Sequence, residues 1–314
     1  MLLVLLVLSI APIVIFANMI YKRDFDKEPK SILIKLFLCG VGSTFLTLII
    51  TKLLTSIIPF FGFNYTELDA IELIPYVFIG VALIEEFSKW IFVYKLEYND
   101  NEFNHLYDGI VYAAFVSLGF ACFENILYVM QSGITTAILR AFLAIPGHLC
   151  DGIMMGYYLS MAKLAMCNNH KSLSKKNLIL SLIIPTVAHG IYDYLIFAST
   201  VTDNSLFLIA FFIFIVFFFT YASKKVKQLS LSAYNMNPNY ISKNHIQQPN
   251  MYQNQISYPQ QTYQNYPQQQ SYAQQTQTPT VGYAQNNTPQ MKFCPYCGTP
   301  AKGKFCSKCG KQIV

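Results

Sequence analysis

The chain is poor in charge. Only 12% of its 314 residues are Asp, Glu, Lys or Arg, whereas 54% are hydrophobic. This composition argues against an ordinary soluble domain and is typical of a membrane protein. The net charge is only +6, and we expect the excess of Lys and Arg to lie in loops and in the C-terminal tail. That excess therefore bears on membrane orientation before nucleic-acid binding.

Other expected signals are missing as well. The first apolar segment has neither the basic start nor the small-residue cleavage site of a signal peptide, so we expect it to be retained as a helix. The chain has no His-Glu-x-x-His sequence, which excludes the common helical zinc-protease motif. It also has no obvious internal repeat of the kind that many transporters show.

Long apolar stretches, in contrast, are abundant. We predict an all-α polytopic membrane protein with about seven transmembrane helices, because each stretch can cross a hydrocarbon core about 30 Å thick. The predicted spans are 2–20, 31–59, 71–95, 109–131, 134–163, 177–199 and 203–222. Pro146-Gly147 predicts a break in the fifth span, which is tolerated where a helix lines a cavity.

The basic loops predict an orientation. Lys and Arg follow the first, fifth and seventh spans, whereas the loops 60–70, 132–133 and 200–202 contain none. The positive-inside rule then places the N-terminus outside and the C-terminus in the cytoplasm. Loop 96–108 is acidic, but acidic residues carry little weight in this rule. We therefore expect a multi-pass membrane protein with its C-terminal tail in the cytoplasm.

The composition changes after a predicted membrane core of residues 1–222. Residues 223–291 begin with a basic stop and continue as a linker rich in Gln, Asn, Tyr and Pro, which we predict to be disordered. Residues 292–314 contain two Cys-x-x-Cys-Gly turns, with the thiols of Cys294, Cys297, Cys306 and Cys309. Four thiolates at this spacing predict a closed structural zinc site, that is, a zinc ribbon. We expect a protein or peptide partner for it rather than nucleic acid.

Ionisable residues interrupt four of the predicted spans. A charged group in the middle of a membrane helix costs roughly 2.5–3.5 kcal/mol on insertion scales, so these groups must meet each other or water. They are Glu85, Glu86, Lys89, Glu124, His148, Asp151, His189 and Asp193. Carboxylates, imidazoles and a lysine that converge in a shielded cavity are typical of a hydrolytic site or an ion path. The order of the spans places Glu124 and Asp193 toward the outer leaflet and predicts an extracytoplasmic opening.

Three motifs, in this order, resemble those of the PrsW family of bacterial intramembrane proteases: Glu85-Glu86-x-x-Lys89, Phe120-x-x-x-Glu124 and His189-x-x-x-Asp193. The stretches Asp108-Gly109-Ile110-Val111-Tyr112 and Pro146-Gly147-His148 strengthen the resemblance, which covers about residues 1–222. The family is related to the type II CAAX prenyl proteases and shares their helical membrane core. Those relatives carry a histidine where this chain has Glu124.

The resemblance implies a metalloprotease that makes the first cut in a membrane-anchored anti-sigma factor, on its extracytoplasmic side. In the mechanism we favour, Glu85 is the general base for the attacking water. Glu124, His148 and His189 hold either a divalent metal, with zinc expected, or the water itself. Glu86 and Lys89 order the site, and Asp193 orients His189. Activation of water by Glu85 and His189 without a metal stays open.

Other functions fit the same residues. A proton-coupled transporter or channel would use the intramembrane acids and histidines as a relay. A CAAX-type or bacteriocin-processing peptidase of the related superfamily would differ in its substrate. In a further alternative, the membrane region is a sensor scaffold for the zinc ribbon, and changes in the cavity would then leave function intact.

Overall fold

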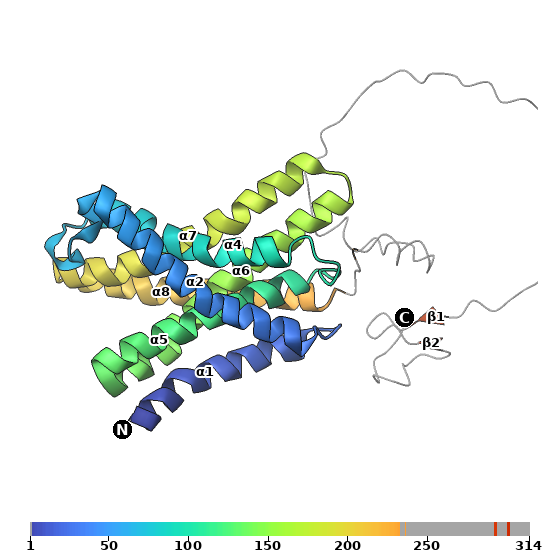
Figure 1. Cartoon of the computed structure of the whole chain (residues 1–314), viewed down its shortest axis with the longest axis horizontal. Coiled ribbons are helices and arrows are strands. Elements are labelled where there is room, and N and C mark those ends of the chain that lie inside the picture. The colour runs from blue at the N-terminus through green and yellow to red at the C-terminus, as the bar shows by residue number, and fades with distance from the viewer. Residues whose placement is uncertain (1, 233–235, 237–291, 294–299, 302–314) are drawn as a thin grey trace, which may run out of the picture. The chain divides into compact units, whose positions relative to one another are not determined.

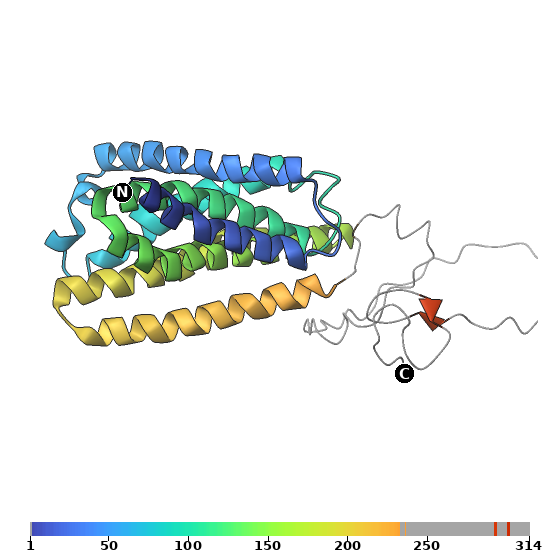
Figure 2. The same ribbon diagram turned by 90° about the horizontal axis from the view of Figure 1, so that it is seen from below.

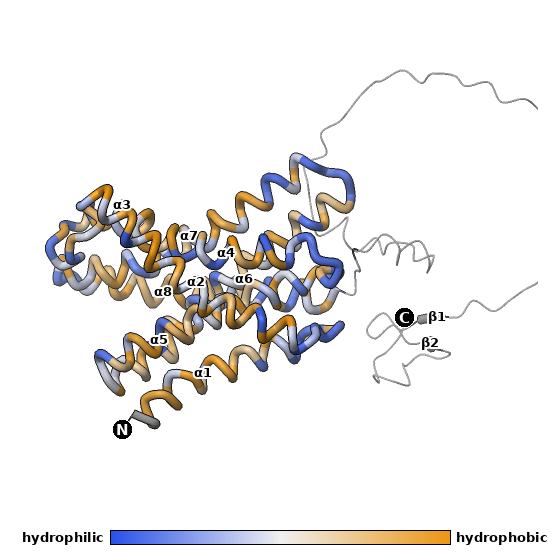
Figure 3. Tube along the Cα trace, in the orientation of Figure 1, coloured by the Kyte–Doolittle hydropathy of each residue, from blue (hydrophilic) through white to orange (hydrophobic). Residues whose placement is uncertain are grey.

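The computed structural model describes residues 2–232, 236, 292–293 and 300–301. The chain divides into two compact units, Met1–Gln248 and Pro249–Val314. The first unit is a bundle of long helices, most of them apolar along their length with hydrophilic residues gathered at the bundle ends (Figure 3). The prediction of an all-α polytopic membrane protein is confirmed for this unit.

In the described part of the chain, five helical stretches are long and apolar enough to cross a membrane. They are α1 (Leu2–Arg23), α2 (Lys30–Ile57), the stretch Asp108–Cys167, α7 (Lys171–Thr202) and α8 (Ser205–Ser230). The stretch Asp108–Cys167 is 78% buried in its most apolar window, against 22% for α1 and for α8. This stretch is therefore the centre of the bundle, whereas α1 and α8 turn most of their apolar surface outward.

The central stretch contains two helices, α5 (Asp108–Phe142) and α6 (Ala144–Cys167). They pack antiparallel, because Gly109 faces Gly156 and Ser117 faces Gly152 further along. Any side chain larger than hydrogen at Gly109 or Gly156 would collide with the facing backbone. Small residues that let two backbones approach are a common device of membrane helices.

The fifth predicted span, 134–163, is wrong in its bounds. Gly133 has φ of +78°, a conformation open to glycine, and divides α5 into a long arm and a short arm. The short arm ends before Leu143, and α6 begins at Ala144. The predicted break at Pro146-Gly147 is therefore displaced, because Pro146 stands in the first turn of α6, where no backbone hydrogen bond is lost.

The third predicted span, 71–95, is built from three short elements. These are α3 (Leu73–Pro75), the π-helix η3 (Tyr76–Leu83) and α4 (Ile84–Leu96). Two short 3₁₀ turns, η1 (Pro59–Gly62) and η2 (Tyr65–Glu67), connect α2 to it. π-Helical segments are rare in proteins, and those that occur are often found at functional sites. Here η3 ends at Leu83, two residues before Glu85.

The loop after α1, the α6–α7 turn and the end of α8 lie at the same end of the bundle (Figure 2). Two contacts also place the segment after α4 at this end. Lys35 of α2 forms an ion pair with Glu97, and Lys163 of α6 donates to the carbonyl of Tyr98. Helix α8 continues to Ser230, eight residues past the predicted end of the membrane core at 222. Its Lys225 reaches back over the ring of Tyr157 on α6.

In the second unit, two short strands are described. Strand β1 (Lys292–Phe293) pairs antiparallel with β2 (Pro300–Ala301). Most of the predicted linker, residues 233–235 and 237–291, lies outside the described residues, and so do the four cysteines Cys294, Cys297, Cys306 and Cys309. The zinc ribbon therefore stays a prediction.

Candidate active site

Glu86 and Lys89 form the buried centre of the intramembrane cluster, in the first turns of α4. Lys89 Nζ donates to Glu86 Oε1 at 2.8 Å, and both side chains are fully buried. Glu85 Oε2 lies 3.8 Å from the same ammonium. Lys89 also lies over the ring of Phe120 on α5, 4.1 Å from its centroid. Helical spacing permits either glutamate as the partner of Lys89, and the structure pairs it with Glu86.

His189 of α7 lies among carboxylates from three helices. Its Nδ1 is 2.8 Å from Glu86 Oε1 and 3.9 Å from Asp151 Oδ2. Its Nε2 is 3.3 Å from Asp193 Oδ2 and 3.8 Å from Glu85 Oε2. Carboxylates on both ring nitrogens hold the imidazole in one orientation. Glu86 lies nearer to the ring than Asp193, the residue that the sequence predicts to orient it.

His148 of α6 connects this centre to Glu124 of α5. Its Nδ1 is 3.1 Å from Lys89 Nζ, and its Nε2 is 2.8 Å from Glu124 Oε2. The two histidine rings meet edge to face, with centroids 5.3 Å apart. All six residues predicted as catalytic therefore lie in one cluster built by four helices: Glu85, Glu86, Glu124, His148, His189 and Asp193.

Arg140 is a member of the cluster that sequence reasoning missed. It lies on the short arm of α5, which folds back after Gly133. Its Nη2 donates to Glu124 Oε2 at 2.6 Å, and its Nε donates to Asn125 Oδ1 at 3.0 Å. The available signal was an arginine in an apolar segment, but its partner could not be read without the turn.

Exposure increases across the cluster in one direction. The side chains of Glu124, Arg140 and Asp193 are 16–17% exposed. The side chains of Glu86 and Lys89 have no exposed area. Water therefore has its best access from the Glu124 and Asp193 side, while the ion pair on α4 forms the floor.

The donor atoms fit a divalent cation. Two groups of described residues bring their ligand atoms within 4.8 Å of one another, and His148 belongs to both. The first group is Glu86, His148, Asp151 and His189; the second is Glu85, Glu124 and His148. The predicted trio of His148, His189 and Glu124 is divided between them. Buried oxygens of Glu85, Glu86 and Asp151 have no hydrogen-bond partner, and imidazole with carboxylate is a ligand set that suits zinc.

A second group of buried acids lies at the end of the bundle where α1 ends and α5 begins. It contains Asp24, Glu28 and Asp108, each at most 6% exposed. Asp108 Oδ2 accepts the backbone N–H groups of Asn104 and His105. Burial raises the pKa of Glu28 to about 9, with Asp108 adding to the effect, and burial raises that of Asp24 to about 6. These acids are not in either of the two possible metal groups found in the described part of the chain.

The chain is similar to known proteases. The model of the PrsW family of intramembrane metalloproteases matches residues 28–221. A protein named Protease PrsW from Oceanobacillus iheyensis is 39% identical over 188 residues, which cover 60% of this chain and 80% of that protein. Protease PrsW of Bacillus subtilis is 30% identical over 224 residues, covering 71% of this chain and 95% of that protein. No solved structure matches the chain.

Proposed function

Because the chain belongs to the PrsW family of intramembrane metalloproteases, we propose that its buried cluster hydrolyses a peptide bond of a membrane-anchored regulatory protein. The observation that carries this proposal is the convergence of Glu85, Glu124, His148 and His189 from four helices. An isolated charged residue inside a membrane has a high free-energy cost, so the convergence of these four residues indicates a functional site.

Glu85 is proposed as the general base. Its buried Oε2 has no hydrogen-bond partner. Glu86 also has one free oxygen, but its Oε1 is held by both Lys89 and His189. Glu85 can therefore take a proton from the attacking water. Glu85 can then pass that proton to the amine leaving group, and His189 Nε2 lies 3.8 Å from its Oε2. Glu86 and Asp193 position His189, and Arg140 positions Glu124 against His148.

A divalent cation, with zinc expected, would be held by three of Glu86, His148, Asp151 and His189, which leaves one position open to water and Glu85 free as the base. When bound, such an ion polarises the scissile carbonyl and lowers the pKa of a water molecule. Negative charge supports this assignment, because the five carboxyl groups of the cluster face, among the residues that the structure describes, only two side chains with fixed positive charge, Lys89 and Arg140.

The proposed orientation places the N-terminus outside and the C-terminal segment in the cytoplasm. The location of the basic loops at one bundle end and the greater exposure of Glu124 and Asp193 on the opposite side of the Glu86–Lys89 pair support it. The cut then falls on the extracytoplasmic side of the membrane. An anti-sigma factor with a single span is the substrate that we propose.

Reconstitution tests this function. The purified full-length protein is placed in lipid vesicles with candidate single-span anti-sigma factors, and cleavage products are identified by mass spectrometry. We expect one cut beside the span, abolished by a zinc chelator and restored by zinc. The matched control is Glu67→Gln, an exposed acid in the α2–α3 connection. Proton transport without cleavage would favour the transporter instead.

We also propose a second, structural zinc ion on Cys294, Cys297, Cys306 and Cys309. The full-length protein should then contain two zinc ions. Replacing Cys294 and Cys297 by serine should remove one ion and leave cleavage intact, because these residues lie outside the family match. Unchanged metal content in that variant would refute the zinc ribbon.

A further inference from the structure

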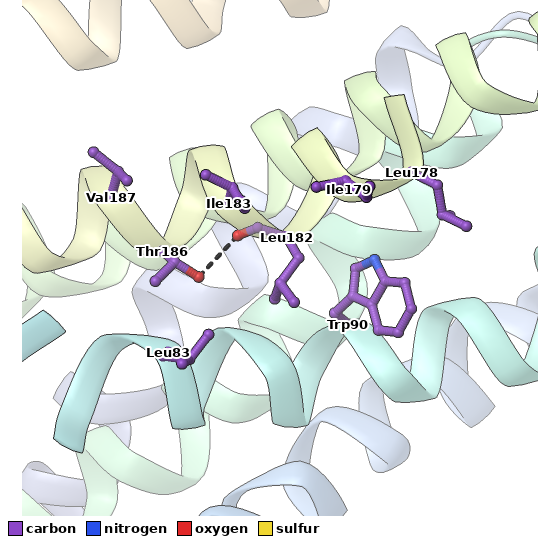
Figure 4. A pocket seen from close by; sticks show the side chains of 8 residues that line it. All are labelled: Leu83, Trp90, Leu178, Ile179, Leu182, Ile183, Thr186 and Val187. Carbon is purple, nitrogen blue, oxygen red and sulfur yellow. Dashed lines mark hydrogen bonds between the residues drawn. The ribbon is translucent and has the colours of Figure 1, made fainter. Parts of the chain in front are cut away.

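Helix α7 has two chemically different faces. One face lines an apolar groove between α7 and α4, where the hydroxyl of Thr186 donates to a carbonyl of its own helix at 2.8 Å, as the dashed line in Figure 4 marks. The other face carries His189 and Asp193 of the cluster. Tyr192, three residues after His189, lies on this same face. A tyrosine therefore belongs to the catalytic face of α7.

The ring of Tyr192 packs against the first turn of α6, beside His148. A Cβ built on Gly147 would lie 3.5 Å from this ring, which is ordinary van der Waals contact. The ring of Phe211 on α8 meets it edge to face, with centroids 4.9 Å apart. These contacts hold the phenol at the start of α6, where the positive end of the helix dipole favours negative charge.

The hydroxyl of Tyr192 lies on the more exposed side of the cluster. The charges of Asp193, Arg140 and Glu124 act on it, and these are the residues whose side chains are 16–17% exposed. The hydroxyl makes no hydrogen bond to any residue that the structure describes. A largely enclosed tyrosine usually directs its hydroxyl to a partner, so this donor is available to a bound substrate.

The other donors of the cluster are already engaged. Lys89 donates to Glu86, and Arg140 donates to Glu124 and Asn125. Each ring nitrogen of the two histidines lies within 3.3 Å of a charged side chain. A developing negative charge needs a donor that is not already bound to a carboxylate. Within the described cluster, the Tyr192 hydroxyl meets that requirement.

We propose that Tyr192 donates a hydrogen bond to the oxyanion that forms during peptide hydrolysis. In that step, the water oxygen bonds to the scissile carbonyl carbon, a water proton passes to Glu85, and one electron pair of the C=O double bond moves to the carbonyl oxygen. Tyr192 donates to this oxygen and keeps its own proton. The carbonyl then re-forms as the C–N bond breaks, and the amine takes the proton from Glu85. The inference rests on the proposed protease function and adds the donor that its transition state requires.

A second phenol, Tyr128 of α5, feels the charges of the same residues. Its ring lies under the guanidinium of Arg140, with the guanidinium carbon 4.2 Å from the ring centroid. Tyr128 is 47% exposed, whereas Tyr192 is half-buried. A hydrogen bond to a developing charge is strongest where water is excluded, which favours Tyr192.

The test removes only the hydroxyl. Tyr192→Phe keeps the ring and its contacts with Gly147 and Phe211, so the fold should be retained. The full-length variant is assayed in vesicles with a single-span anti-sigma factor that the wild type cleaves. We expect kcat to fall about 100-fold and KM to stay within about twofold, because the bond forms only in the transition state. The matched control is Tyr194→Phe, whose ring packs against Phe207 and whose kcat should not change.

Binding gives a second readout that does not depend on turnover. The probe is a phosphonamidate peptide, a stable mimic of the tetrahedral intermediate, and it is compared with the product peptide of the same sequence. We expect Tyr192→Phe to raise the Kd of the mimic about 100-fold and to leave that of the product peptide unchanged.

Four results would overturn the assignment of Tyr192. They are an unchanged kcat, a change in KM alone, equal weakening of both peptides, and loss of zinc from the variant. A loss of kcat in Tyr128→Phe in place of Tyr192→Phe would also overturn it. Failure of the wild type to cut any spanning substrate would instead refute the proposed function.

Discussion

The molecule buries acids in two places, and the two differ in what accompanies them. In the intramembrane cluster of the candidate active site, every carboxylate lies within 4.0 Å of a lysine, an arginine or an imidazole. In the group of Asp24, Glu28 and Asp108, backbone N–H groups and the nearby Lys27 are the main compensation. The two groups lie about 24 Å apart along α5, from Asp108 to Glu124, at 1.5 Å per residue.

The difference shows two ways to bury an acid. The first cluster keeps charges together, where they can move protons, bind a cation and stabilise a developing charge. The second raises the pKa of Glu28 until this acid is neutral at physiological pH. Burial alone thus does not identify a catalytic acid. The groups that surround the carboxylate distinguish a catalytic acid from a neutral buried one.

The largest expected effect is that of Glu85→Gln. The amide keeps the size of the side chain but cannot accept a proton from water, so cleavage should fall about 100- to 10,000-fold. The measurement is the rate of cleavage in vesicles, with Glu67→Gln as the control. Near-normal cleavage would remove Glu85 from the mechanism and direct attention to Glu124.

The next effect is that of His148→Ala. His148 is the one residue common to both possible metal groups, so its loss should reduce zinc from two ions to one per chain and abolish cleavage. Elemental analysis of the purified protein measures the zinc. Retention of both ions with lost cleavage would mean that His148 acts without a metal.

A smaller effect is expected for Arg140→Gln. The variant loses two hydrogen bonds of the guanidinium, one of them to a carboxylate, and such charge-assisted bonds contribute about 1.5–3 kcal/mol. Cleavage should therefore fall about 10- to 100-fold. Arg140→Lys keeps the positive charge but lacks the planar guanidinium that donates to two acceptors at once, so it should restore only part of the cleavage rate. Full activity of Arg140→Gln would show that Glu124 needs no positioning.

The smallest effect concerns stability in the second group. The pKa of Glu28 rises from 4.5 to about 9 on folding, so the folded protein holds a proton that the unfolded chain releases. Stability from this group is therefore full below pH 4.5 and is lost progressively up to about pH 9. Glu28→Gln should raise the thermal midpoint by a few °C at pH 8, on the order of 1 kcal/mol, and much less at pH 5. A difference that does not depend on pH would contradict the buried-acid interpretation. Cleavage should be unchanged, since Glu28 lies far from the site.

Much of the candidate site could be predicted from the sequence. Ionisable residues are conspicuous in apolar segments, and the membrane penalty requires them to meet, so Glu85, His148 and His189 were brought together without a structure. The helical period also placed Lys89 on a face with a glutamate. The helical period could not decide whether Glu85 or Glu86 pairs with Lys89, because residues three apart and residues four apart are both neighbours on a helix surface. The approach of His189 from α7 places Glu86 at the centre.

Sequence alone determined the membrane class, the approximate helices and the family, because hydropathy and short motifs are local properties. Only the tertiary structure decided the partner of Arg140, which depends on one positive φ at Gly133, and the burial of Glu28 beside Asp108. The same is true of the packing of Tyr192 against Gly147 of α6. Each of these features joins segments far apart in the chain. Their contacts follow from how whole helices pack, which no local period encodes.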